Sequence, residues 1–319
     1  MDYLFDILIL GSKLIDIAVF IGRFQPFHKG HLENCIQALA QAKKLIILIG
    51  SSGIGPLPNN PWSFDERVKI ILASLPEKLH SRVQFISLYD SLYDQKDWEN
   101  RVKHSIAEHS HVSDTKALVV FAKDDSSFYL ECFPEWAQIN LPMVVDANDQ
   151  CISATNIRAE LYEHGKVSNE IVTLAAKNII HSYTSHPLFK NLKMADQVLN
   201  QYQKSHQIMH VLMVYNNEHV MVHQREELLG SQQWALPMFE DKSKQGILLE
   251  SMCHDDSILR SETIESSLLK ITYNITYVAL DESMDAPEGY KLFSKSMLIE
   301  KDFFADHRSI AYKPMQLKY

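Results

Sequence analysis

Two apolar, β-rich runs limit the fold more than any other feature: residues 17–21 (IAVFI) and 45–49 (LIILI). Continuous runs of this kind suit strands that are buried on both faces of a parallel sheet. Between the runs, apolar residues recur at helical spacing from Leu32 to Ala40. The segment therefore predicts a β-α-β unit.

The alternation of strand and helix continues over the first ~165 residues. Ser63 and Glu66 form a capping box before an apolar-periodic segment, and Ser153 is a good N-cap for a helix that ends near Gly165. This pattern predicts an α/β fold, with a doubly wound, Rossmann-like parallel sheet that binds its ligand at the carboxyl ends of the strands. Further strands are expected at 83–88, 117–121 and 142–145.

The second half of the chain has a different pattern of predicted helices and strands. Residues 168–206 read as helix, with Pro187 marking a helix start, and a hairpin signal over 208–223 opens an α+β domain. The predicted division is a first domain over 1–183, a helical connector over 184–206 and a second domain over 207–319.

Composition argues against several classes of partner. The 319 residues include 31 basic and 40 acidic side chains, and the net charge of -9 makes a nucleic-acid partner unexpected. Four scattered cysteines without a C-x-x-C pair indicate reduced thiols of a cytoplasmic protein. No stretch approaches the ~20 apolar residues that cross a bilayer, so no membrane partner is expected. Whether the chain forms a homo-oligomer stays open.

The segment 22–31 (GRFQPFHKGH) is the most informative for function. Gly22 lets the backbone approach a ligand closely, and Pro26 stiffens the loop. His28 and His31 lie three apart at a helix N-terminus, where backbone N–H groups and the helix dipole favour phosphate. Any two histidines could be ordinary polar residues of a first turn, but the Gly, Phe and Pro at fixed offsets favour a surface that binds oxyanions.

This segment resembles the signature of the HIGH-type nucleotidyltransferase superfamily, and the chain is similar to nicotinamide mononucleotide adenylyltransferases of the bacterial and archaeal type that is often fused to a Nudix domain. A second family motif, I-S-x-T-x-x-R, stands at 152–158. The resemblance implies that this helix start and Arg158 bind the phosphates of ATP, and the fork of an arginine can grip two phosphate oxygens. The residues expected to bind ATP are Gly22, Arg23, Phe24, Lys29, Ile152, Ser153 and Thr155.

The resemblance implies transfer of AMP from ATP to nicotinamide mononucleotide, which yields NAD and pyrophosphate. We expect direct in-line attack on the α-phosphorus, with positioning and charge stabilisation by His28, His31 and Arg158, and with Mg²⁺ on the phosphates. No side chain of the protein is assigned as a metal ligand. Two alternatives stay open: another acceptor, such as nicotinic acid mononucleotide or phosphopantetheine, and a nucleotide-sensing regulator that catalyses nothing.

Weaker stretches bear on the acceptor. Nicotinamide mononucleotide carries a cationic pyridinium, which the face of a tryptophan attracts by about 0.5 to 2 kcal/mol. Trp98 is a candidate stacking partner, with Asp94 or Asp124 as polar neighbours, and the competing interpretation is a half-buried packing residue. The stretches that resemble the family are 62–67 (WSFDER), 93–98 (YDQKDW), 121–129 and 133–136.

The second domain resembles a degenerate Nudix hydrolase domain. The remnants are 234–237 (WALP) and 303–307 (FFADH), but Met238 and Phe239 stand where glycines are expected, and no R-E-x-x-E-E follows. Two carboxylates offer few ligands for Mg²⁺, so we expect Nudix hydrolysis to be lost, with hydrolysis through a rearranged site as the alternative. Arg260, Glu262 and Glu265 are interpreted as a solvated helix face.

Overall fold

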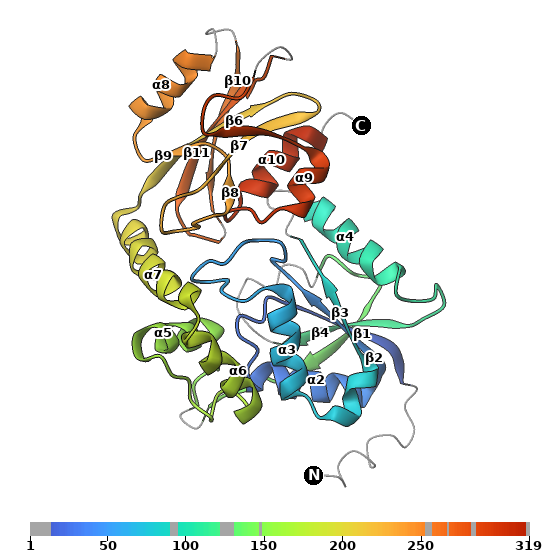
Figure 1. Ribbon diagram of the computed structural model, residues 1–319. Coiled ribbons are helices and arrows are strands. Elements are labelled where there is room, and N and C mark those ends of the chain that lie inside the picture. Colours follow the sequence, from blue (N-terminus) through green and yellow to red (C-terminus); the bar gives the residue numbers. More distant parts are fainter. Residues whose placement is uncertain are drawn as a thin grey trace. The chain divides into compact units, whose positions relative to one another are not determined.

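The computed structural model (Figure 1) describes residues 14–89, 95–121, 131–146, 149–252, 257–266, 268–281 and 285–316. The chain packs as two compact units. The first unit comprises Met1–Ser52 and Trp62–His186, and the second comprises Gly53–Pro61 and Pro187–Tyr319. The division thus differs from the sequence-based one at two places: the nine residues 53–61 and the helix that begins at Pro187 both pack with the second unit.

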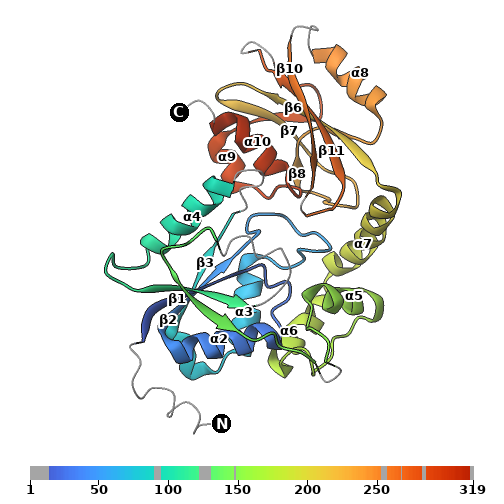
Figure 2. The ribbon, with the colours of Figure 1, turned by 180° about the vertical axis from the view of Figure 1, so that it is seen from behind.

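A five-stranded parallel sheet forms the centre of the first unit, in the order β3-β2-β1-β4-β5. This order, with helices between the strands (Figure 2), confirms the predicted doubly wound fold. The strands are β1 (Ile15–Gly22), β2 (Ala42–Ile49), β3 (Val83–Ser87), β4 (Lys116–Phe121) and β5 (Ala137–Leu141). The helices are α2 (Lys29–Gln41), α3 (Phe64–Ser74), the 3-10 helix η1 (Glu77–Arg82), α4 (Gln95–Ala107), α5 (Ala154–His164) and α6 (Leu174–Thr184).

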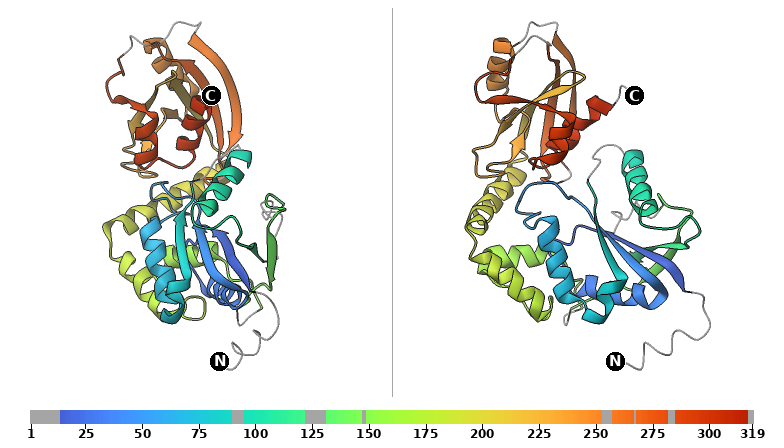
Figure 3. Two further views of the ribbon diagram at one scale, coloured as in Figure 1. Left: turned by 90° about the vertical axis from the view of Figure 1, so that its right-hand side faces the viewer. Right: turned by 45° about the vertical axis from the view of Figure 1, so that its right-hand side comes forward.

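Helices cover both faces of this sheet (Figure 3, left). Ile17 and Val19 of β1 pack in one cluster with Val102 and Ile106 of α4. Phe20, which follows Val19, points to the other face, where its ring lies 6.1 Å from that of His31 at the start of α2. Burial on both faces explains why β1 is a continuous apolar run rather than an alternating one.

Two details of the first unit differ from the sequence prediction. The strand expected at 142–145 lies instead at β5, and Val145 makes only an isolated bridge to Cys151. The reason is visible in β5 itself, since buried Ile139 alternates with exposed neighbours as in a half-buried edge strand. Helix α4 was not predicted, because only Val102 and Ile106 of its 13 residues are buried.

The second unit contains a mixed sheet in the order β10-β11-β6-β7-β12, with β8 paired to β7 and β9 paired to β6. The predicted hairpin is confirmed, because β6 and β7 are antiparallel neighbours. The strands are β6 (Ile208–Tyr215), β7 (His219–Gln224), β8 (Trp234–Ala235), β9 (Met238–Phe239), β10 (Ile258–Glu265), β11 (Thr272–Ala279) and β12 (Tyr290–Ser294). The helices are α7 (Pro187–Ser205), α8 (Lys242–Met252), α9 (Lys295–Glu300) and α10 (His307–Gln316).

The two faces of this sheet bear different helices. Leu248 and Leu249 of α8 pack on one face against Leu212 and Val214 of β6. The larger core lies on the other face and takes side chains from three helices, namely Leu199 of α7, Leu298 of α9 and Ile310 of α10. Among the residues that the structure describes, no helix is long and apolar enough to span a membrane.

Candidate active site

The loop between β1 and α2 ends in two histidines that cap the helix. Nδ1 of His28 accepts a hydrogen bond from the backbone N–H of His31 (3.4 Å), and Nδ1 of His31 accepts one from the N–H of His28 (3.3 Å). Their rings stack, with centroids 3.6 Å apart and an interplanar angle of 20°. His28 is buried and His31 is half-buried. The spacing of three residues therefore brings both rings to one place.

The capping bonds decide which edge of each imidazole donates. A neutral imidazole carries one proton, and since Nδ1 of each ring accepts, the proton lies on Nε2. Three backbone amides of this helix start already donate within the protein. Those of His28 and His31 are used in the cap, and that of Lys29 donates to the carbonyl of Ile171 (2.8 Å). A phosphate at this helix start would therefore have to meet the Nε2–H edges rather than these three amides.

Arg158 of α5 connects the two sequence motifs. The residue is 8% exposed, and its guanidinium donates from Nη1 to the carbonyl oxygen of Gln25 (2.5 Å) and from Nη2 to Oγ1 of Thr155 (3.3 Å). Gln25 lies in the loop three residues before His28, and 133 positions from Arg158 in the sequence. The guanidinium of the second motif thus lies against the loop that carries the histidines of the first.

Gln25 and Arg67 organise this loop, and neither was singled out from the sequence. The amide of Gln25 forms a pair of hydrogen bonds with the backbone of Trp62, donating to its carbonyl (2.8 Å) and accepting from its N–H (3.1 Å). Arg67 is 1% exposed and donates from Nη1 to the carbonyls of Arg23 (2.9 Å) and Gly50 (2.7 Å). The stretch 62–67 therefore acts on the loop as a scaffold. Its capping box, predicted from the sequence, is present.

Gly22 lies against the ring of Phe24. A Cβ at this position would lie 2.8 Å from the ring of Phe24, which is buried and has a positive φ of 53°. A larger side chain at this position would have to displace the ring of Phe24, and the approach of Gly22 to a ligand stays a prediction. Arg23 is exposed and Lys29 is half-buried, so both can reach solvent at this end of the sheet.

The start of α5 has the predicted residues in place. Ser153 is the N-cap, but its side chain makes no capping hydrogen bond, which leaves the first N–H groups of α5 without that partner. Ile152 and Ser153 are half-buried, and Thr155 is exposed. Gly165 ends the helix in the left-handed conformation with a φ of 67°, as predicted.

Trp98 lies on α4, half-buried against the aromatic core. Its ring is 6.0 Å from that of Phe133, which in turn stacks on Trp136 at 4.6 Å. These contacts support the interpretation of Trp98 as a packing residue. Because part of the ring is exposed, stacking on a pyridinium stays a prediction. Asp94 and Asp124 lie outside the described residues.

The charged residues of the second unit that were read as a helix face lie on a strand. Arg260, Glu262 and Glu265 belong to β10, where Arg260 lies over the ring of Tyr277 (4.2 Å) and Glu262 accepts its hydroxyl (2.5 Å). The helix interpretation was therefore wrong, and two of the three side chains pack on a buried tyrosine. Nowhere in the described ranges do three His, Cys, Asp or Glu side chains gather as metal ligands.

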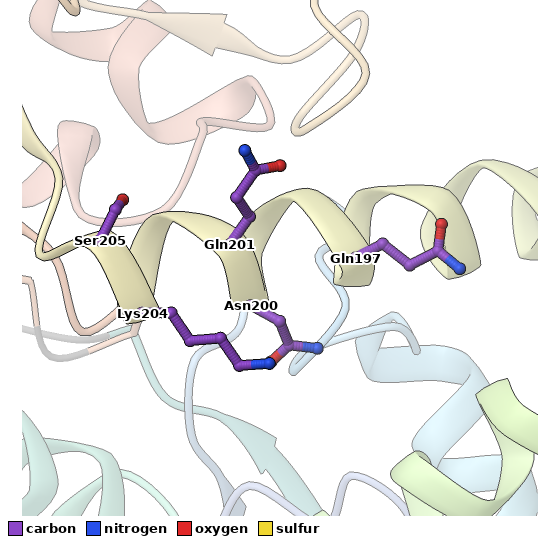
Figure 4. Close-up of a pocket in the computed structure, with 5 residues that line it drawn as sticks. All are labelled: Gln197, Asn200, Gln201, Lys204 and Ser205. Carbon is purple, nitrogen blue, oxygen red and sulfur yellow. The ribbon is translucent and has the colours of Figure 1, made fainter.

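A hollow of about 630 Å³ runs along α7 (Figure 4). Asn200 and Lys204 point to one side of the helix and Gln201 and Ser205 to the other, so the polar groups do not converge on a ligand. The amide of Asn200 is already bound to Asp196 on the same helix (2.9 Å). We assign no chemistry to this surface.

Comparisons with known proteins agree with the geometry. Residues 19–160 match the cytidylyltransferase-like family. The chain is 35% identical over 182 residues to a nicotinamide/nicotinic acid mononucleotide adenylyltransferase of Acinetobacter baylyi, covering 56% of this chain and 92% of that relative. It is 28% identical over 148 residues to nicotinamide-nucleotide adenylyltransferase 1 of Sulfolobus acidocaldarius, covering 46% of this chain and 78% of that protein.

One solved structure resembles both units. The crystal structure of a bifunctional NMN adenylyltransferase/ADP ribose pyrophosphatase from Francisella tularensis matches with a TM-score of 0.79 and 25% identity, over 95% of this chain and 99% of that chain. A second structure of that protein, 24% identical, is a complex with AMP and a Mn ion. The likeness confirms a nucleotidyltransferase fold followed by a Nudix-like mixed-sheet domain.

Proposed function

Because the chain belongs to the family of nicotinamide/nicotinic acid mononucleotide adenylyltransferases, we propose that its first unit transfers AMP from ATP to nicotinamide mononucleotide and releases NAD and pyrophosphate. One observation carries the assignment of the site: the guanidinium of Arg158 donates to Gln25, in the loop that ends in the stacked imidazoles of His28 and His31. A triphosphate bound there would meet donors from the starts of two helices.

The proposed reaction is a single displacement. A phosphate oxygen of the mononucleotide attacks the α-phosphorus of ATP, the bond from that phosphorus to the bridging oxygen breaks, and pyrophosphate leaves with the electron pair. The nucleophile is already an anion, so no base is needed, and catalysis consists of alignment and charge stabilisation. The neutral imidazoles of His28 and His31 donate from Nε2, and Arg158 adds a permanent positive charge.

Mg²⁺ is proposed to enter with ATP rather than to reside on the protein. The side chains of the site are hydrogen-bond donors and cations, which do not suit a Mg²⁺ ion, and the described residues hold no cluster of three metal-ligating side chains. Mg²⁺ is commonly coordinated by substrate phosphates and water molecules. The ion would neutralise charge on those phosphates while the protein holds them.

The acceptor distinguishes the proposal from its alternatives. Nicotinamide mononucleotide is the first candidate, and nicotinic acid mononucleotide is the second because the Acinetobacter baylyi relative is named for both. The test supplies ATP and Mg²⁺ with either of these or with phosphopantetheine and measures pyrophosphate. We expect release with a pyridine mononucleotide. Release with phosphopantetheine alone would reassign the acceptor, and silence with all three would support a nucleotide sensor.

The second unit is proposed to have lost the hydrolase activity of its relatives. Met238 and Phe239 form the short strand β9, paired to β6, where the resemblance expects glycines. In α8, Gln245 is buried and its amide donates to the carbonyl of Val211 (3.3 Å), so this side chain is hydrogen-bonded inside the second unit. If hydrolysis is lost, the second unit must contribute to the protein in some other way.

A further inference from the structure

Residues 53–61, here called the strap, leave the first half of the sequence to become part of the second unit. The N–H of Gly55 donates to the carbonyl of Phe303 (3.1 Å), and Ile54 forms a parallel bridge to the same residue. The carbonyl of Pro56 accepts from Nε2 of Gln233 (2.6 Å). Two backbone groups of the strap are therefore satisfied by residues more than 170 positions away.

The strap also completes the core of the second unit. Leu57 is 0% exposed and belongs to the cluster that contains Val211 and Phe303. A Cβ at Gly55 would lie 2.4 Å from the side chain of Gln233, so a larger residue there would have to displace that side chain. Further along, Asn59 donates from its amide to the carbonyl of Leu268. Such burial and close packing fix the strap on the second unit.

The two residues that flank the strap, Ser52 and Trp62, belong to the first unit. Ser52 is 2% exposed, its N–H donates to Leu88 (3.1 Å) and its hydroxyl donates to Ile49 at the end of β2 (2.7 Å). Trp62, the residue that follows the strap, clamps the side chain of Gln25 through both of its backbone groups. The carbonyl of Gln25 is in turn held by Arg158.

We propose that the second unit, through this strap, positions residues 22–28 of the first unit, here called the nucleotide loop. Gln233 and Leu57 are then positioning residues of the transferase. The proposal rests on the proposed function of the first unit. Its physical basis is covalent continuity: Pro56, held by Gln233, is six residues from Trp62, and Trp62 holds Gln25. A hydrolase domain without its catalytic box is then retained because the transferase site depends on it.

The test compares two glutamines of the second unit that both donate to a carbonyl. Gln233→Ala removes the bond to Pro56 on the strap, whereas Gln224→Ala removes a bond to Gln232 (3.0 Å) that does not involve the strap. We expect Gln233→Ala to lower kcat for pyrophosphate release by roughly 10- to 100-fold, as for misplacement of a catalytic loop. Gln224→Ala should stay within about twofold of wild type.

A double-mutant cycle with Gln25 separates positioning from general destabilisation. Gln25→Ala cuts the link between Trp62 and the loop, so adding Gln233→Ala should lower kcat by less than about twofold further. Multiplicative losses in the double variant would overturn the proposal, and so would a Gln233→Ala enzyme with wild-type kcat. If Gln233→Ala fails to fold, Asn59→Ala replaces it, because it releases the strap at a half-buried site.

Hydrogen exchange gives a readout that does not depend on activity. Amides of the loop 22–28 and of Trp62 should exchange roughly tenfold faster in Gln233→Ala, and at the wild-type rate in Gln224→Ala. Unchanged exchange in the loop would refute the strap even where activity falls. If the wild-type protein shows no turnover while exchange is faster in Gln233→Ala, the proposed function is refuted but the proposed role of the strap is not.

Discussion

His31 has two roles that a pair of substitutions can separate. Its Nδ1 caps α2 by accepting from the N–H of His28, and its Nε2 is the proposed donor to phosphate. The amide oxygen of asparagine is separated from Cβ by the same number of bonds as Nδ1 of histidine. The amide nitrogen of glutamine is separated from Cβ by the same number of bonds as Nε2 of histidine. His31→Asn should therefore keep the cap and lose the donor, while His31→Gln should do the reverse.

The expected magnitudes differ enough to be told apart. Loss of one preorganised donor to a developing charge costs ~2.7 to 4 kcal/mol of barrier, which is about 10²- to 10³-fold in kcat. Loss of a cap costs ~0.5 to 2 kcal/mol of stability, and the 3.3 Å length of this bond argues for the lower end. A loss of about 1 kcal/mol lowers Tm by ~2 to 4 °C in a domain of this size.

The assay measures pyrophosphate release at saturating ATP and nicotinamide mononucleotide, alongside thermal unfolding of each variant. His31→Asn should lose at least about 100-fold in kcat with an unchanged Tm, and His31→Gln should keep more of its kcat with a lower Tm. A His31→Asn enzyme within twofold of wild type would show that Nε2 does not touch the reacting phosphate. A loss of kcat confined to His31→Gln would show that the cap alone matters, and equal losses in both variants would contradict the separation of the two roles.

Three further predictions concern mechanism and the second unit. With ATP chirally labelled by sulfur at the α-phosphorus, the product should show inverted configuration, since retention would require an adenylyl-enzyme. ADP-ribose and Mg²⁺ should yield no AMP above the background of the buffer, and measurable AMP would restore hydrolysis to the second unit. Burial beside Arg225 and His223 holds the pKa of His307 well below its usual value, so the unfolded state takes up the proton first and stability should fall below pH 6.5 by about 1.4 kcal/mol per pH unit. Urea unfolding at several pH values should show this slope, and the slope should flatten in His307→Gln.

The regular part of the fold could be read from the sequence because burial leaves a pattern there. β1 is apolar at every position from Ile17 to Phe20, since helices cover both faces of the sheet. β5 carries only a short alternation of buried and exposed residues, and the apolar run after it was mistaken for the strand. In β10, the spacing of two between Arg260 and Glu262 could have indicated a strand, but the sequence alone did not show the ring of Tyr277 between them.

The site was predictable where the chemistry is local and not where it depends on distant contacts. His28 and His31 are three residues apart at a helix start, so their proximity follows from the local geometry of an N-cap and the third helical residue. The side chains of Gln25 and Arg67 act on backbone groups of Trp62, Arg23 and Gly50, which lie 17 to 44 positions away, and nothing in their neighbourhoods in the sequence marks those partners. The strap was missed for the same reason, because its partners come from the far end of the chain.

The most direct test of the proposed site is a crystal structure with a non-hydrolysable ATP analogue and nicotinamide mononucleotide. The two Nε2 atoms of His28 and His31 and the guanidinium of Arg158 should lie 2.7 to 3.1 Å from oxygens of the triphosphate. The mononucleotide phosphate should stand in line with the bond to be broken at the α-phosphorus. A triphosphate bound away from these three side chains, or imidazoles turned from it, would contradict the proposed site.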